Sequence, residues 1–235
     1  MKLSVLVFSG VLLFATGCDQ RRGSGRIVTE KRNVSAFSKL SASSGLNVEV
    51  RKGSTHEVTV EADDNIIGLI ETTVEDGRLI LKIKDHTNLS DSHTSIFLTV
   101  PQLSEIKASS GSNVEVKDQL TYNGVINFDA SSAGHITTSV DAPTISAEAS
   151  SGAELEISGR TKDFKARSSS GSSIKAFELY TENAVAEASS GASVNTRPSV
   201  SLEGNASSGG NINYRGGAPS IKKQESSGGN ISKED

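Results

Sequence analysis

Residues 187–196 read EASSGASVNT, and variants of this stretch recur along most of the 235-residue chain. When the copies are aligned on the Gly of Ser-Ser-Gly, one copy has Ala133 at that place and the others have Gly45, Gly111, Gly152, Gly171, Gly191, Gly209 and Gly228. From Gly111 onward the intervals are 22, 19, 19, 20, 18 and 19 residues. A self-similar period of this length predicts a repeat architecture whose unit is shorter than any helical repeat.

Apolar and polar residues alternate strictly within each unit, which is the signature of a half-buried β-strand. Three positions of the unit, five and three residues before the Gly and three residues after it, are apolar or small: Leu40, Ile106, Phe128, Ala147, Ala166, Ala186 and Gly204; Ala42, Ala108, Ala130, Ala149, Ser168, Ala188 and Ala206; Val48, Val114, Ile136, Leu155, Ile174, Val194, Ile212 and Ile231. We therefore expect residues at odd offsets from the Gly to face inward.

The same parity predicts that the second Ser of each pair points inward: Ser44, Ser110, Ser132, Ser151, Ser170, Ser190, Ser208 and Ser227. Inward hydroxyls of stacked units would hydrogen bond to one another or to the backbone, so that no buried polar group lacks a partner. So many equivalent serines indicate a structural role rather than catalysis.

The repeat predicts an all-β fold, a parallel β-helix or solenoid with coils of about 19 residues. At about 3.3 Å per residue, one coil has a perimeter near 60 Å, which suits two or three short strands. Parallel crossovers are overwhelmingly right-handed, so a right-handed solenoid is expected. The seven repeated glycines are predicted to form the structural corner of each coil, because glycine adopts backbone conformations that a Cβ disfavours.

The N-terminal third departs from the repeat. Between Gly45 and Gly111 lie two alternating runs joined by Asp76-Gly77, which is a strong hairpin signal. We expect residues 51–102 to form a hairpin insertion or a cap that protects one end of the solenoid. At the other end, inward positions carry Lys223, Glu225 and Lys233, which suits a polar terminal coil.

The first residues of the chain predict export. Lys2 is followed by one apolar run and a small-residue stretch, so residues 1–17 are interpreted as a signal peptide. The stretch ends in ATGC, which resembles a bacterial lipobox, and Cys18 is the only cysteine. We therefore expect lipidation at Cys18, a lipidated tether over 18–25 and a single domain over 26–235. Acyl chains would anchor the protein to a membrane of the bacterial cell envelope, at the outer membrane or on the periplasmic face.

Composition and charge exclude several functions. The formal net charge is −4, the pI is near 5.7, and basic residues cluster only in QRRGSGR (20–26), so nucleic-acid binding is not expected. The four histidines, His56, His86, His93 and His135, are scattered and have no Cys partner, so no metal site or cofactor is predicted. EADDN (61–65) clusters carboxylates that can hold a cation, although a polar loop is the simpler interpretation.

One row of charged residues is a candidate for chemistry. Asp129, Glu148, Arg167 and Glu187 stand four residues before the Gly position of successive coils and should form an outward ladder. Adjacent carboxylates are what a glycosidase needs, but alternating charges are also what cross-strand pairing selects. No catalytic residues are assigned. Few exposed aromatic side chains are expected, which weakens any carbohydrate-binding interpretation.

Several blocks together resemble a known family: VSAFSKLSASSGLNVEVRKGSTHEVTVEADDNIIGLIETTVEDGRLILKI (34–83), TVPQLSEIKASSGSNVEV (99–116) and SSGGNIN (207–213). They are similar to the putative auto-transporter adhesin, head GIN domain family (DUF2807-type) of bacterial envelope proteins. The resemblance implies a β-helical domain on an exported, often lipid-anchored protein, and it brings no catalytic residues.

Two functions therefore stay open. The first is a non-enzymatic, adhesin-like envelope lipoprotein whose solenoid binds a polysaccharide, an envelope or surface protein, or another copy of itself. The second is a polysaccharide-active β-helix enzyme that uses the acidic ladder.

Overall fold

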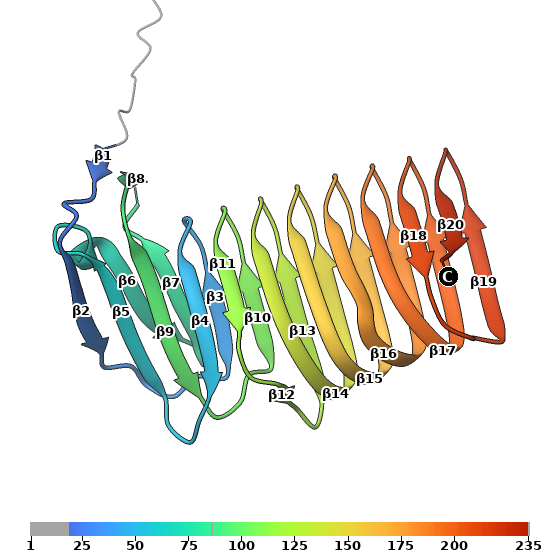
Figure 1. The fold of residues 1–235 in the computed structure, drawn as a ribbon, viewed down its shortest axis with the longest axis horizontal. Coiled ribbons are helices and arrows are strands. Elements are labelled where there is room, and N and C mark those ends of the chain that lie inside the picture. The colour runs from blue at the N-terminus through green and yellow to red at the C-terminus, as the bar shows by residue number, and fades with distance from the viewer. Residues whose placement is uncertain (1–18, 86, 235) are drawn as a thin grey trace, which may run out of the picture.

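The computed structural model describes residues 19–85 and 87–234, and nearly all regular secondary structure in this part of the chain is β-strand, wound into a flattened parallel β-solenoid (Figure 1). Each coil contributes one strand to each of two opposing faces. The Ser-Ser-Gly turns lie along one edge, and the chain crosses back between the faces along the other edge. The predicted all-β solenoid with coils of about 19 residues is confirmed.

We name the faces after β10 and β11. The β10 face runs, strand by strand, through β6 (Ile70–Glu75), β7 (Arg78–Ile83), β3 (Lys39–Ala42), β10 (Glu105–Ala108), β13 (Val125–Ala130), the second halves of β14 (His135–Ala149), β15 (Glu154–Ser168), β16 (Ser173–Ala188) and β17 (Ser193–Ala206), and β19 (Ser220–Glu225). The β11 face runs through β2 (Ile27–Arg32), β5 (Glu57–Asp63), β9 (Thr94–Val100), β4 (Asn47–Lys52), β11 (Asn113–Val116), the first halves of β14 to β17, β18 (Asn211–Tyr214) and β20 (Asn230–Lys233).

A thin core separates the two faces. The three columns of apolar or small residues predicted from the alternation are all buried, from Leu40 in the first coil to Ile231 in the last. Ala fills the column nearest the turns in most coils because the two faces converge there and leave room only for small side chains. This geometry explains how the chain builds a core without Trp.

The predicted inward orientation of the second Ser is wrong. All eight of these serines are exposed and have a positive φ, between 49° and 64°. The Ser and the following residue, which is Gly in all copies except Ala133, form the two central positions of a tight turn, closed for example by the bond from Ser112 N to Ser109 O. Positive φ at both central positions defines a type I′ turn. The turn interrupts the alternation, so parity continues only from the residue after it.

The residue after the Gly faces inward instead, and in the two copies where it is Ser, Ser112 and Ser172, it takes the role expected of the second Ser. Ser172 is buried, and its hydroxyl donates to Ala149 O at 2.8 Å and lies 2.9 Å from the Ser168 hydroxyl. Ser112 donates to Ala42 O of the preceding coil, also at 2.8 Å. Inward hydroxyls therefore satisfy the backbone of the turns, as expected, but from the neighbouring position.

Residues 51–102 extend both faces at the N-terminal end. The Asp76-Gly77 turn joins β6 to β7, and the confirmed hairpin continues the β10 face, while β5 and β9 form antiparallel pairs on the β11 face. A 3₁₀ helix, η1 (Ile67–Leu69), connects the two layers. β8 (Thr87–Ser90) pairs in parallel with β1 (Asp19–Arg22), so part of the segment expected to be a lipidated tether is a strand.

Charged side chains close the C-terminal coil from within. Lys223 Nζ donates to Ile231 O at 2.8 Å, and Glu225 accepts from Ile231 N at 2.5 Å. Inward charges on an edge strand disfavour further strand addition. Within the two described ranges, no helix has the length and apolarity required to cross a bilayer.

Candidate functional site

An open groove follows the β10 face just below the Ser-Ser-Gly edge. It has a volume of about 460 Å³, and we name it the serine groove. Its lining residues come from β13 to β17 and the turns between them: Asp129, Glu148, Ala149, Ser150, Arg167, Ser168, Ser169, Glu187, Ala188, Ser189, Asn205 and Ser207. The ladder predicted from the sequence thus lines this groove.

Two parallel rows form the groove. The strand register aligns Asp129 with Glu148, Glu148 with Arg167, and Arg167 with Glu187. Beside them, the first Ser of each turn contributes a row of half-buried hydroxyls from Ser150 to Ser207. Because stacked strands are about 4.8 Å apart, polar groups recur at this spacing along the groove.

Ion pairs balance most of the ladder. Lys107 Nζ lies 3.1 Å from Asp129, and Arg167 lies 3.3 Å from Glu187. The hydrogen bond to Asp129 raises the pKa of Lys107 above its ordinary 10.5, although partial burial opposes this. Burial would raise the pKa of Glu105, but hydrogen bonds from Arg78 and Lys107 outweigh burial and lower it below 4.5.

The ladder lacks the environment of a catalytic carboxylate pair. Glu148 is exposed, and Asp129 is engaged by Lys107, so neither carboxylate has the apolar surroundings that would keep a general acid protonated. The open groove also does not exclude water from a reacting bond. These residues are arranged as cross-strand charge pairs that present hydrogen-bonding groups to solvent.

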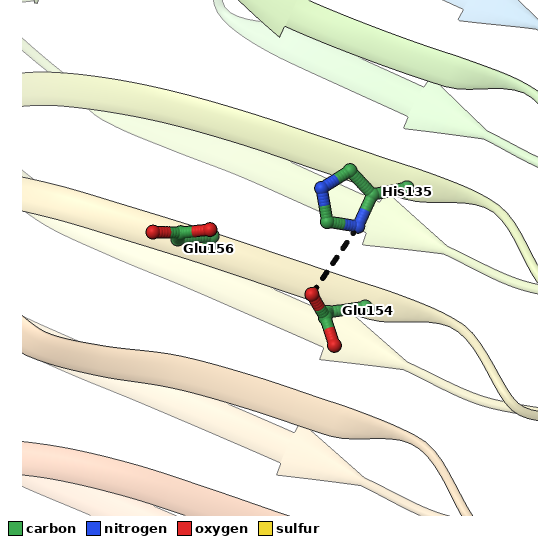
Figure 2. Close-up of side chains that lie close together, drawn as sticks. All are labelled: His135, Glu154 and Glu156. Carbon is green, nitrogen blue, oxygen red and sulfur yellow. Dashed lines mark ion pairs between the residues drawn. The ribbon is translucent and has the colours of Figure 1, made fainter.

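A second cluster lies on the β11 face, where β14 and β15 bring His135 beside Glu154 and Glu156 (Figure 2). The ligand atoms of the three residues lie within 4.8 Å of one another, and His135 Nδ1 is 3.5 Å from Glu154. Lys175 Nζ lies 2.8 Å from the other oxygen of Glu154, and His135 Nε2 bonds to Thr137. Lys175 therefore already pairs with one of the two carboxylates. The sequence did not reveal this cluster because His135 meets the two glutamates only through the strand register.

The other described histidines have structural partners. His56 Nε2 lies 2.9 Å from Phe37 O, and its ring packs edge-on against the Phe37 ring. His93 Nε2 lies 2.9 Å from Glu61. His86 lies outside the described residues.

The acidic stretch 61–65 is a polar loop that holds the N-terminal segment. Asp63 is only 2% exposed, and it accepts hydrogen bonds from Gly25 N and His93 N at 2.6 and 2.7 Å. Asp64 binds Ser24 and Arg26, and the Ser24 hydroxyl is the main cause of the lowered pKa of Asp64. These carboxylates therefore have protein partners in place of a cation.

The structure places the seven corner glycines at the same position of each turn, with φ between 70° and 77°. Their amides donate along the edge to the carbonyl of the second Ser of the next coil, as from Gly171 N to Ser190 O at 3.1 Å. Gly228, in the last described coil, is the exception: no such bond is found for it in the described residues. Cys18, the predicted lipidation site, lies outside the described residues.

Known proteins share this architecture. A putative adhesin of Bacteroides fragilis has a crystal structure with a TM-score of 0.84 at 17% identity, covering 91% of this chain and 100% of that chain. A putative lipid binding protein of Parabacteroides distasonis (TM-score 0.74, 18% identity, 92% and 100% coverage) and a putative adhesin of Parabacteroides merdae (0.72, 15%, 92% and 100%) are also similar. At these identities the likeness concerns the fold alone.

A search of curated proteins finds no match. The family model described as "Putative auto-transporter adhesin, head GIN domain" matches residues 36–218, which is most of the chain and spans both the N-terminal strands and the repeated coils. The chain therefore belongs to the head GIN domain family.

Proposed function

We propose that this protein is an exported, lipid-anchored protein of the bacterial cell envelope whose solenoid is a non-enzymatic, adhesin-like binding domain. The serine groove is the observation that carries the proposal. It offers hydroxyl, carboxylate and guanidinium groups at the spacing of the coils, and it is open along its length. Such a surface fits an extended polar partner, a polysaccharide or a segment of an envelope protein.

The lipobox-like ATGC supports anchoring at Cys18. Asp19, the next residue, begins β1, which lies with β8 beyond the Ser-Ser-Gly edge at the N-terminal end (Figure 1). An anchor at Cys18 would hold this corner of the solenoid next to the membrane, with the loop 61–65 fixing its orientation through Ser24, Gly25 and Arg26.

Replacing Cys18 with Ser tests the anchor. We expect Cys18→Ser to fold normally, since the residue precedes the solenoid, and to leave the membrane fraction after cell fractionation and carbonate washing. A variant that still sediments with washed membranes would show that the anchor does not depend on Cys18.

Replacing the groove carboxylates tests the non-enzymatic binding role. The triple variant Asp129→Asn, Glu148→Gln, Glu187→Gln should change the free energy of unfolding by at most about 1 to 2 kcal/mol, the usual size of exposed cross-strand pairs. Its affinity for a polysaccharide or envelope partner should fall, whereas a matched control, Glu30→Gln, Glu57→Gln, Glu75→Gln, should bind normally. Release of reducing ends by the wild-type protein, abolished by Glu148→Gln, would contradict the non-enzymatic role.

A further inference from the structure

A second groove lies on the edge opposite the Ser-Ser-Gly turns, where β14 to β17 cross from one face to the other. Its volume is about 470 Å³, and we name it the corner groove. The register places Arg160 beside Tyr180, and Tyr180 beside Arg197, in three successive coils. Lys162 and Glu182 line the groove next to them.

Differences in coil length are absorbed along this edge. The register between β15 and β16 shifts between Glu156 and Gly159, and that between β16 and β17 shifts between Lys175 and Tyr180. Gly159 has a φ of 111°, and a Cβ there would lie 2.1 Å from Val140 O, so only Gly fits this backbone conformation. The backbone of the Ser-Ser-Gly edge is therefore uniform from coil to coil, whereas the backbone that forms the corner groove differs between coils.

The aromatic ring at the centre of the groove is accessible. Tyr180 is 53% exposed and is one of the few aromatic side chains that face solvent in the described residues. The Arg197 guanidinium carbon lies 4.4 Å from the centroid of the Tyr180 ring. A guanidinium that lies over a ring keeps the N–H groups at its edge available to bind an anionic group.

The cations of the groove form no ion pairs in the part of the chain that the structure describes, and they outnumber its two carboxylates. Within the described ranges, no carboxylate oxygen lies within 4.0 Å of the charged nitrogens of Arg160, Lys162 or Arg197. By contrast, Lys107, Arg167 and Lys175 on the two faces are all paired. Charged groups that are close together and unpaired raise the local potential and attract anions.

Hydrogen bonds hold the backbone of the groove. The Thr181 hydroxyl donates to Asn183 O at 3.0 Å, the Thr161 hydroxyl donates to Asp163 O at 3.2 Å, and Ser199 donates to Thr181 O at 3.0 Å. A site that is already ordered loses little conformational entropy when a ligand binds.

We propose that the corner groove binds an anionic carbohydrate chain that carries carboxylate or sulfate groups. A sugar ring would pack against Tyr180, and its acidic groups would bind Arg160, Lys162 and Arg197. The carboxylates of Asp141 and Glu182 in the same groove would accept hydrogen bonds from sugar hydroxyls. They would also repel simple polyanions, which favours a glycan over a polyphosphate.

The two arginines are about 10 Å apart, two strand spacings, so a chain lying along the edge can contact both. This inference goes beyond the serine groove, because it adds a second surface and its ligand class to the binding role proposed above.

The test is isothermal titration of the purified lipidated protein in detergent with four probes: oligogalacturonate, sulfated dextran, neutral dextran and inorganic polyphosphate. We expect at least one of the first two to bind more tightly than neutral dextran, with an affinity that falls as salt is added. Binding of the uronate probe alone identifies carboxylate as the recognised group, and binding of the sulfated probe alone identifies sulfate.

Variants locate the binding. Arg160→Gln combined with Arg197→Gln should weaken the acidic probe at least tenfold, and Tyr180→Ala should weaken it severalfold. Lys165→Gln combined with Lys222→Gln removes the same two charges from exposed positions outside both grooves and should leave it unchanged. Unchanged melting temperatures would show that the variants fold.

Three results would overturn the inference. The first is no preference for acidic over neutral chains, and the second is an equal loss of binding in the Lys165→Gln and Lys222→Gln control. The third is polyphosphate binding that matches that of the acidic glycan and is unchanged by Tyr180→Ala. A protein that binds neutral dextran through the serine groove alone would overturn the inference and leave the proposed function standing. If no probe binds, the inference fails, and partner binding by the triple amide variant still tests the proposed function separately.

Discussion

Val194→Asp is the sharpest test of the stacked core. Val194 is completely buried, between Ile174 and Ile212 of the neighbouring coils. Removing the Val side chain forfeits about 1.5 kcal/mol of burial. An unpaired carboxyl in its place costs about 3 to 5 kcal/mol more. We therefore expect a loss of roughly 5 kcal/mol, a large part of the 5–15 kcal/mol by which domains are usually stable.

Thermal and urea unfolding followed by circular dichroism would measure this loss. For a chain of this size, about 5 kcal/mol corresponds to a fall in melting temperature of roughly 10 to 20 °C. Hydrogen exchange in β16 to β18 would detect unfolding confined to these coils, which a repeat array permits.

The control is Asn195→Asp, one residue further on and outward-facing. Asn195 Oδ1 accepts a hydrogen bond from Asn213 at 3.2 Å, and Asp keeps an oxygen there, so the change should stay within about 0.5 kcal/mol. Equal stability of the two variants would refute the inward and outward assignment, and with it the register of the solenoid.

Two further outcomes are expected. Ser172→Ala should cost about 1 to 2 kcal/mol because it leaves Ser168 and the turn backbone without their hydrogen bonds. The double variant with Ser168→Ala recreates the Ala188 and Ala192 pair of the next coil and should cost less than the sum of the single changes. Additive losses in urea unfolding would contradict this coupling. Because the pKa of Glu105 is lowered in the fold, its stabilising contribution is fully present above pH 4.5 and is lost as the pH falls through the lower folded-state pKa. Glu105→Gln should therefore cost about 1 kcal/mol at pH 7 and make stability less dependent on pH in the acid range. An unchanged acid dependence would argue against the ion pairs with Arg78 and Lys107.

Much of the fold is predictable from local pattern. The period near 19 residues and the alternation around Val194 and its equivalents identify a solenoid and its inward columns, because side chains on a strand alternate between faces whatever surrounds them. Asp76-Gly77 likewise predicts the β6–β7 hairpin, because a type I′ turn needs residues that tolerate positive φ. The charged ladder was predictable because its members share one offset in the repeat.

The orientation of the second Ser could not be read from alternation. Counting by twos assumes a continuous strand, whereas Ser170 and Gly171 form a turn in the left-handed region, and the count restarts at Ser172. The repeated Ser-Gly pair is itself a type I′ signal, so turn chemistry was the information that could have corrected the assignment.

The sequence by itself thus determined what each coil is made of: its inward columns, its turns and its ladder of charges. Only the tertiary structure decided which side chains of different coils meet away from the turns. Coil length varies from 18 to 22 residues, and the register absorbs the variation along the edge that carries Tyr180, Arg160 and Arg197. The contact between Asp63 and Gly25, 38 positions apart, is of the same kind. Periodicity is a local property of the chain, whereas register and long-range docking depend on how whole coils pack, so the corner groove emerges only in the folded molecule.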